Sequence, residues 1–157
     1  MAKEVERKFL VSSDEWRDMV GPGTFMSQFY LVAEPDRSVR VRIRQGAAPV
    51  LTLKLGLDGL ARDEFEYELS IADAEAMRSH MRGSVVEKTR FEVSHGAHIY
   101  EVDVFGGSLD GLVVAELETP DDVAQADLPS WLGREVTGQA AYYNASLAMR
   151  GLPETPA

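Results

Sequence analysis

No cysteine occurs in the chain. Disulfides and thiolate metal sites are therefore excluded, so any metal ion must be held by oxygen or imidazole ligands. No apolar run comes close to the roughly 20 residues that a transmembrane helix requires. The first residues alternate acids and bases and lack the apolar core of a signal peptide. From these absences we expect a cytoplasmic protein that does not bind membranes.

Two further shortages narrow the range of functions. The chain has no glycine-rich GK[ST] loop, which excludes a P-loop enzyme. The 16 Lys and Arg residues are outnumbered by 26 Asp and Glu, and the net charge of −10 argues against binding to nucleic acid or anionic membranes. A local cluster of basic residues can still bind a small anion, and the surplus carboxylates can hold hard divalent cations.

What the chain contains in abundance is alternation of polar and apolar residues. Successive side chains of a β-strand point to opposite faces, so Glu4, Glu6 and Lys8 share one face while Phe9 and Val11 share the other. The same period of two predicts eight strands, at residues 4–11, 25–32, 38–45, 50–55, 62–69, 85–93, 98–105 and 112–119. Helices are expected at 12–20, 71–82 and 139–149, with a short helical segment after Pro120.

The polar faces of these strands are sorted by charge. The basic faces carry Arg40, Arg42, Arg44, Lys54, Lys88 and Arg90. The acidic faces carry Glu64, Glu66, Glu68, Glu101, Asp103, Glu116 and Glu118. One alternating strand by itself normally turns such a face to water, but a solvated face mixes signs and neutral polar residues. Because like charges at neighbouring positions repel, this sorting indicates that a bound ligand offsets the repulsion.

A closed antiparallel barrel of eight strands accounts for this pattern, because interior and exterior residues alternate on every strand of a barrel. We therefore predict a mainly β, α+β fold in which a charged tunnel runs through the barrel and a few helices pack outside. One wall would be guanidinium and ammonium, and the other carboxylate. Arginine binds phosphate oxygens two at a time, and carboxylates bind Mg²⁺ or Mn²⁺. The matching ligand is a metal-bound polyphosphate.

The residues also resemble a known family. Glu4-Val5-Glu6-Arg7-Lys8 is similar to the ExExK signature of the CYTH superfamily, the triphosphate tunnel metalloenzymes, which include short bacterial inorganic triphosphatases. Six further matches follow in the family's order: Arg-Val-Arg at 40–42, Thr-Leu-Lys at 52–54, Arg-Asp-Glu-Phe-Glu at 62–66, Glu-Lys-Thr-Arg at 87–90, Glu-Val-Asp-Val-Phe at 101–105 and Glu-Leu-Glu at 116–118. The resemblance runs from Lys3 to about Leu147 and implies one domain over residues 1–150, followed by a flexible tail at 151–157.

The resemblance implies a role for each wall of the tunnel. The residues that would bind metal, two ions of Mg²⁺ or Mn²⁺, are Glu4, Glu6, Asp103, Glu116 and Glu118. The residues that would bind phosphate are Lys8, Arg40, Arg42, Lys54, Lys88 and Arg90. Lys8 and Lys88 would also act in catalysis, while Glu64 and Glu66 match the remaining tunnel acids, whose roles the resemblance leaves open. On chemical grounds, either a second metal ion or a carboxylate such as Glu66 would position the attacking water.

The predicted reaction is the hydrolysis of inorganic triphosphate to pyrophosphate and phosphate. The predicted partner is this small anionic substrate, and the protein would be a monomer or homodimer. We see no aromatic pocket for a base or a thiazolium ring. Three alternatives remain open: a class IV adenylyl cyclase, a thiamine or nucleoside triphosphatase, and a polyphosphate-binding module without turnover.

One departure from the family pattern concerns the last helix. Members often carry a basic residue just before Tyr-x-Asn, in a segment that can plug one tunnel mouth, whereas this chain has Gln139-Ala140-Ala141 before Tyr142-Tyr143-Asn144. The missing charge bears on how the far end of the substrate is held.

The histidines and tryptophans are expected to lie outside the chemistry. His95 and His98 fall in a predicted hairpin turn, where we expect no metal role. Trp16 and Trp131 are expected to pack in the core.

Overall fold

A computed structural model describes residues 5–57 and 62–153. Glu4, one of the expected metal ligands, lies outside the described residues, and so does most of the expected flexible tail. The described chain forms a single nine-stranded antiparallel sheet. The strands are β1 (Val5–Val11), β2 (Thr24–Glu34), β3 (Arg37–Arg44), β4 (Val50–Leu55), β5 (Asp63–Glu68), β6 (Arg82–His95), β7 (His98–Phe105), β8 (Val113–Thr119) and β9 (Leu132–Glu135).

The helices are few and short. They are α1 (Ile71–Arg78), α2 (Asn144–Arg150) and four 3-10 turns at Glu15–Met19, Gly107–Leu109, Gln125–Asp127 and Ala140–Tyr142. Ser70 begins α1, because its hydroxyl accepts a hydrogen bond from the backbone N–H of Asp73. Among the described residues, no helix combines the length and hydropathy required of a membrane-spanning segment.

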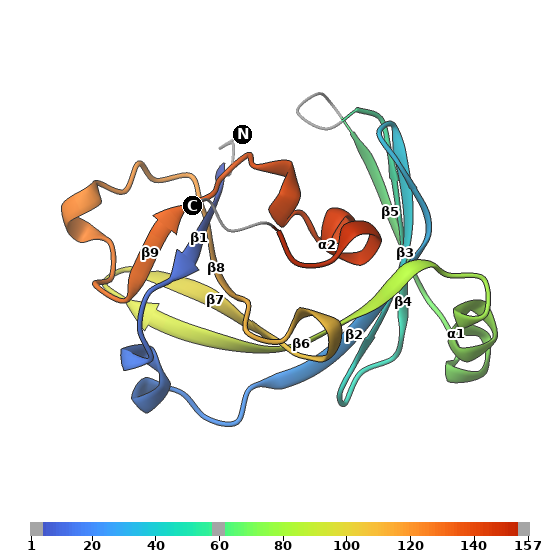
Figure 1. The fold of residues 1–157 in the computed structure, drawn as a ribbon, viewed down its shortest axis with the longest axis horizontal. Helices are drawn as coiled ribbons and strands as arrows, with labels where there is room; N and C mark the ends of the chain where they lie inside the picture. Colours follow the sequence, from blue (N-terminus) through green and yellow to red (C-terminus); the bar gives the residue numbers. More distant parts are fainter. Residues whose placement is uncertain (1–4, 58–61, 154–157) are drawn as a thin grey trace.

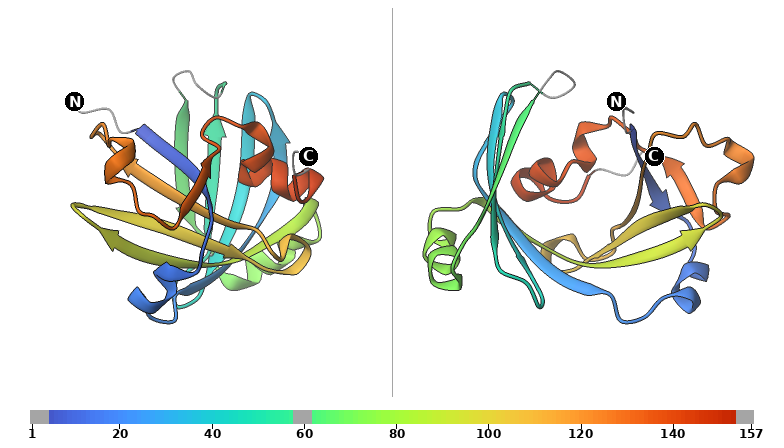
Figure 2. Two further views of the ribbon diagram at one scale, coloured as in Figure 1. Left: turned by 60° about the vertical axis from the view of Figure 1, so that its left-hand side comes forward. Right: turned by 180° about the vertical axis from the view of Figure 1, so that it is seen from behind.

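The sheet order is β5-β4-β3-β2-β6-β7-β8-β1-β9. The sheet bends strongly, so that β3–β5 form one wall and β1, β8 and β9 the other, with the long strands β2, β6 and β7 joining them (Figures 1 and 2). All eight predicted strands are present and the mainly antiparallel β fold is confirmed. Within the described residues the ladder of strand pairs does not close into a ring, and its edges are β5 and β9.

Three apolar clusters hold this sheet in shape. On the convex side, Trp16 and Trp131 pack with Tyr100, and both indoles are almost fully buried, which confirms their packing role. Under α1, Ala74 packs against Phe29 in a second cluster on the same side. The third cluster lies on the concave face, where α2 packs onto the sheet.

The C-terminal segment, residues 139–150, occupies the space between the two walls (Figures 1 and 2). Leu147 and Ala148 of α2 pack there against Val86 and Phe105. We expected one continuous helix at 139–149, but Tyr143 is extended and separates a 3-10 turn from α2. Because of this break, the carbonyl of Tyr142 has no partner four residues on in a helix and accepts a side-chain hydrogen bond instead.

Candidate functional site

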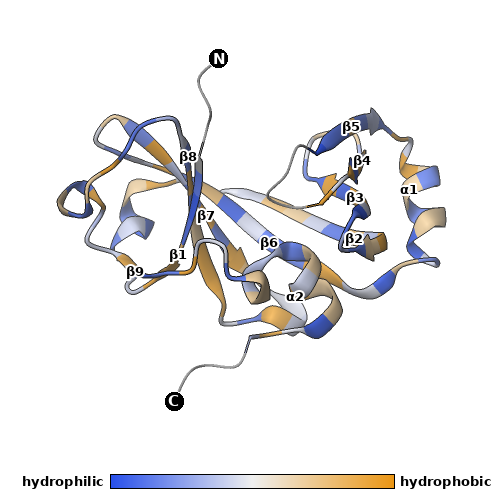
Figure 3. Cartoon of the chain, turned by 90° about the horizontal axis from the view of Figure 1, so that it is seen from above, coloured by the Kyte–Doolittle hydropathy of each residue, from blue (hydrophilic) through white to orange (hydrophobic). Residues whose placement is uncertain are grey.

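The pairing register carries the charged residues onto one face of the sheet. Directly paired residues of antiparallel strands point to the same side. Lys8 pairs with Glu116, which pairs with Glu101, so three charged residues from β1, β8 and β7 stand in one row. The alternation of hydrophilic and hydrophobic residues is visible along the strands in Figure 3. The sorted charges of the sequence therefore share the concave face.

The acidic wall is built by β1, β7 and β8. Glu6 pairs directly with Glu118. Burial raises the pKa of Glu6, and the carboxylate of Glu116 raises it further, while Lys8 and Lys54 lower it. Lys54 belongs to β4, on the wall that lies opposite β1 in Figures 1 and 2.

The centre of the site is an ion triad of Lys88, Asp103 and Arg90. Lys88 is 1% exposed, and its Nζ lies 2.8 Å from Asp103 Oδ2. The guanidinium of Arg90 grips the same carboxylate twice, through Nε to Oδ1 at 2.8 Å and Nη2 to Oδ2 at 2.9 Å. Asp103, expected among the metal ligands, is thus held by two cations in this structure.

The triad changes the protonation of each member. Burial lowers the pKa of Lys88, and Asp103 offsets this only in part. Burial alone would raise the pKa of Asp103, but the hydrogen bonds and charges of Arg90 and Lys88 outweigh it and the pKa is lowered. Burial likewise opposes the charge on Arg90, yet Asp103 and then Glu101 raise its pKa. Asp103 thus partly offsets the cost of burying the charge of Lys88 and also favours the charged form of Arg90.

The basic wall continues on β3. Arg42 is half-buried, and burial together with Arg40 and Arg90 lowers its pKa to about 10. Its Nε donates to Gln28 Oε1 at 2.9 Å, while Arg40 Nη2 donates to Thr52 Oγ1 at 3.3 Å. Within residues 5–57 and 62–153 both guanidiniums have neutral hydrogen-bond partners and neither forms an ion pair with a carboxylate, so their charge is available to a ligand.

The outermost strands contribute the rest of the predicted set. Lys54 pairs with Glu64, and Thr52, the partner of Arg40, pairs with Glu66. Both glutamates are exposed on the edge strand β5. The structure therefore places all predicted site residues that it describes on one concave surface.

The C-terminal segment reaches both lysines of the site. Lys8 Nζ donates to the carbonyl of Tyr142 at 3.2 Å and lies 5.7 Å from the centre of the Tyr143 ring. Lys88 Nζ donates to Asn144 Oδ1 at 3.4 Å. This segment therefore presents hydrogen-bond acceptors to both cations.

Three residues of the concave face were absent from the predicted site. Gln28 and Tyr30 alternate on β2, and both are buried beside the arginines of β3. Burial raises the pKa of the Tyr30 hydroxyl, with Arg40 and Arg42 opposing it. Glu101 pairs with Glu116 and lies 3.2 Å from Arg90. For Gln28 and Tyr30 the only signal was their alternation on one face, since neutral side chains do not stand out in a charge pattern, whereas Glu101 was already among the acidic faces.

The acids fit a divalent cation only in part. Among residues 5–57 and 62–153, no three His, Asp or Glu side chains lie close enough together to hold a metal ion. Glu6, Glu116 and Glu118 are nevertheless neighbours on β1 and β8, and burial, followed by the charge of Glu116, raises the pKa of Glu6. Oxygen ligands of this kind are those that Mg²⁺ and Mn²⁺ prefer.

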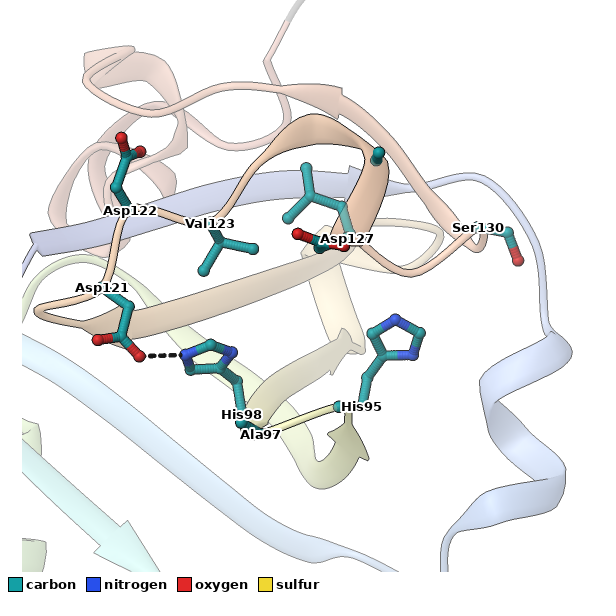
Figure 4. Close-up of a pocket in the computed structure, with 11 residues that line it drawn as sticks. His95, Ala97, His98, Asp121, Asp122, Val123, Asp127 and Ser130 are labelled. Carbon is teal, nitrogen blue, oxygen red and sulfur yellow. Dashed lines mark hydrogen bonds and ion pairs between the residues drawn. The ribbon is translucent and has the colours of Figure 1, made fainter.

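Two pockets help to delimit the site. A pocket of about 360 Å³ opens at one end of the concave face and is lined in part by Arg44, Arg90 and Glu101. The larger pocket, about 630 Å³, lies away from the charged walls, between the β6–β7 turn and the connection that leads to β9 (Figure 4). There His98 Nε2 lies 2.8 Å from Asp121 Oδ2. The histidines thus flank a hairpin turn, as expected, outside the candidate site.

Comparisons with known proteins extend over almost the whole chain. A family model described as the CYTH domain matches residues 2–152. The inorganic triphosphatase of Acetivibrio thermocellus is 38% identical over 148 residues, covering 94% of this chain and 94% of that protein. The inorganic triphosphatase of Nitrosomonas europaea is 37% identical over 150 residues, covering 93% of this chain and 97% of that protein. The crystal structure of the inorganic triphosphatase NE1496 has a TM-score of 0.73 at 32% identity, with 95% of this chain and 96% of that chain covered.

Proposed function

The chain belongs to the CYTH domain family, and on this basis we propose that it is a metal-dependent triphosphatase that hydrolyses inorganic triphosphate to pyrophosphate and phosphate. The observation that carries the proposal is the facing of two oppositely charged walls across one concave surface. Burial and the neighbouring Glu116 raise the pKa of Glu6, while Lys8 and then Lys54 of the opposite wall lower it. A chain of phosphates with a bound cation complements both walls at once.

The basic residues would bind and orient the substrate. Arg40 and Arg42 alternate on β3, and each guanidinium can take two phosphate oxygens. Lys88 and Arg90 extend this row across β6. For Lys8 and Lys88 to contact the phosphoryl group that is transferred, their hydrogen bonds to Tyr142 and Asn144 must be exchanged for bonds to phosphate.

The acidic residues would hold the metal. In our proposal Glu6, Glu116 and Glu118 bind it, Glu4, which lies outside the described residues, completes the set, and Asp103 joins only when it releases a cation. A bound Mg²⁺ or Mn²⁺ would neutralise charge that develops on the phosphoryl oxygens. Glu66, on the rim of the opposite wall, would accept a hydrogen bond from the attacking water and orient it, with Glu64 beside it.

Several finer points belong to the same proposal. They are the presence of two ions, a state of monomer or homodimer, a cytoplasmic location and the absence of nucleic acid and membrane partners. The charge of −10 and the composition of the chain support the location and the absence of these partners, and the family resemblance supports two ions.

The test is a phosphate-release assay with inorganic triphosphate, pyrophosphate, ATP and thiamine triphosphate, each with Mg²⁺ or Mn²⁺. We expect inorganic triphosphate to be cleaved at the highest kcat/KM and ATP to yield little cyclic AMP. Efficient formation of cyclic AMP would identify a cyclase instead. Tight binding of triphosphate with no turnover under any metal condition would identify a binding module.

A further inference from the structure

Gln28 occupies an unusual position at the centre of the basic wall. It lies on β2, paired with Arg42 of β3 on one side and Val86 of β6 on the other, and its side chain is 0% exposed. A carboxamide so deeply buried needs partners for both its acceptor and its donor atoms. The acceptor has one, since Oε1 receives the hydrogen bond from Arg42 Nε at 2.9 Å.

The donor has none among the described residues: Gln28 Nε2 is buried and lacks a hydrogen-bond partner. Rotating the amide by half a turn would not help, because it would set Nε2 against Nε of Arg42, donor against donor. The bond with Arg42 therefore fixes which way the NH₂ group points. A buried donor left unpaired is costly, and native structures keep few of them.

The surroundings define what could pair with this donor. On the same face, Gln28 pairs with Arg42. The next pair in one direction along β2 is Tyr30 with Arg40, and the next in the other direction is Met26 with Lys88. The carboxylate of the triad, Asp103, already accepts hydrogen bonds from Lys88 and Arg90. A ligand that accepts from the Gln28 amide must therefore bring its own oxygen, and the cations around it call for an anionic one.

We propose that Gln28 is a substrate-binding residue, whose Nε2 donates to the same phosphate group that the guanidinium of Arg42 binds. The inference rests on the proposed function of the site. The two polar atoms of the carboxamide then have separate roles. Oε1 accepts the hydrogen bond that positions Arg42, and Nε2 adds one neutral N–H donor beside the donors of the guanidinium. A neutral donor adds a contact without adding repulsion between Arg40, Arg42 and Arg90.

The decisive variant is Gln28→Glu, since it keeps an acceptor for Arg42 and replaces the donor by a negative charge. We expect KM for inorganic triphosphate to rise about 10- to 100-fold, the range for losing one hydrogen bond to a charged group, while kcat falls less. Gln125→Glu is the matched control: it introduces the same charge at an exposed position on the turn 125–127, and its KM should equal that of the parent. An unchanged KM in a folded Gln28→Glu protein would overturn the inference.

A second measurement keeps the test independent of how well the variant folds. In the unmodified protein, the ¹⁵N side-chain amide signals of Gln28 are assigned by their loss in Gln28→Met. They should shift when inorganic triphosphate is titrated in without metal, whereas signals of Gln125 should not. Unmoved Gln28 signals, under conditions where calorimetry shows binding, would assign the residue a purely structural role. A parent protein that neither binds nor cleaves triphosphate would instead refute the proposed function itself.

Discussion

Lys8 and Tyr142 are 134 residues apart in the sequence, yet Lys8 Nζ donates to the Tyr142 carbonyl at 3.2 Å. The same ammonium lies 3.4 Å from Glu116 Oε1. The first strand is thus joined, through one predicted catalytic side chain, to the acidic wall and to the segment that fills the space between the walls. Whatever binds Lys8 competes with both contacts.

Replacing Lys8 with methionine keeps most of the length of the unbranched side chain and removes its charge. We expect kcat/KM for triphosphate to fall by a factor of about 100 or more, since the lost contact involves the reacting phosphate. The backbone amides of α2 should also exchange hydrogen faster, because the C-terminal segment loses an anchor. Wild-type kinetics in this variant would remove Lys8 from the site, and Arg17→Met, at an exposed pair with Asp14, serves as the control.

Glu118→Gln should lower kcat by about 100-fold or more at saturating Mg²⁺ or Mn²⁺, because a ligand charge is lost while the shape is kept. The control Glu75→Gln changes a carboxylate that pairs with Arg78 on α1, outside the concave face. Steady-state kinetics over a range of metal concentrations separate weaker metal binding from slower chemistry. Turnover within twofold of the parent would exclude Glu118 from the metal set.

The raised pKa of Glu6 predicts how stability varies with pH in the metal-free protein. Because the folded state takes up its proton more readily than the unfolded state does, the folded protein loses stability as pH rises from the ordinary glutamate range through the folded pKa. Above that window Glu6→Gln should be more stable than the parent in EDTA. Below the ordinary glutamate pKa the two should be equally stable.

Thermal unfolding at pH 4 and pH 7 measures both differences. Adding Mg²⁺ at pH 7 should stabilise the parent more than Glu6→Gln, since the cation offsets the repulsion that the amide has already removed. A parent that is more stable than the variant at pH 7 without metal would contradict the assigned direction.

Arg42→Ala should raise KM for triphosphate about 10- to 100-fold, because a guanidinium that binds two oxygens of a charged group is lost. Arg37→Ala offers a control on the same strand, since Arg37 is exposed and paired with Asp36. Equal KM values for the two variants would mean that the substrate does not reach β3.

A ligand that fits both walls should stabilise the folded protein strongly. In the slowly hydrolysing variant Glu118→Gln, Mg²⁺ plus triphosphate at 100 times Kd should raise Tm by about 5–10 °C. Inorganic phosphate at equal ionic strength should shift it much less. If Tm stays constant under every metal condition while the protein is folded, the charged face is simply solvated.

Much of this site follows from alternation alone. The period of two located eight strands and sorted their residues between faces, since strand geometry leaves each side chain only two directions. The signs of Arg40, Arg42, Lys88 and Arg90 then indicated a wall for anions, and the structure places all four on one surface. These features depend on local geometry, which neighbouring residues determine.

What depended on distant contacts could not be predicted. β9 is four residues long and contains Gly133, so its pattern is too short to stand out, and only pairing with β1 makes it a strand. Nothing in the local sequence indicates that α2 packs between the walls. Nor does it indicate that Asp103, an expected metal ligand, forms ion pairs with Lys88 and Arg90. Such arrangements are decided by which charges meet in space, and charge patterns along a strand do not contain that information.

The order of the strands also determines when the site can form. β1 is at the start of the chain, yet its neighbours in the sheet are β8 and β9, more than a hundred residues later. During synthesis both edges of β1 stay unpaired until β8 and β9 have been made. Closing a loop over so long a separation in sequence slows folding. Its alternating acids and bases discourage pairing with a wrong strand during that delay. Glu6 and Glu118 meet only when the chain is nearly complete, so a partly made protein lacks this part of the acidic wall.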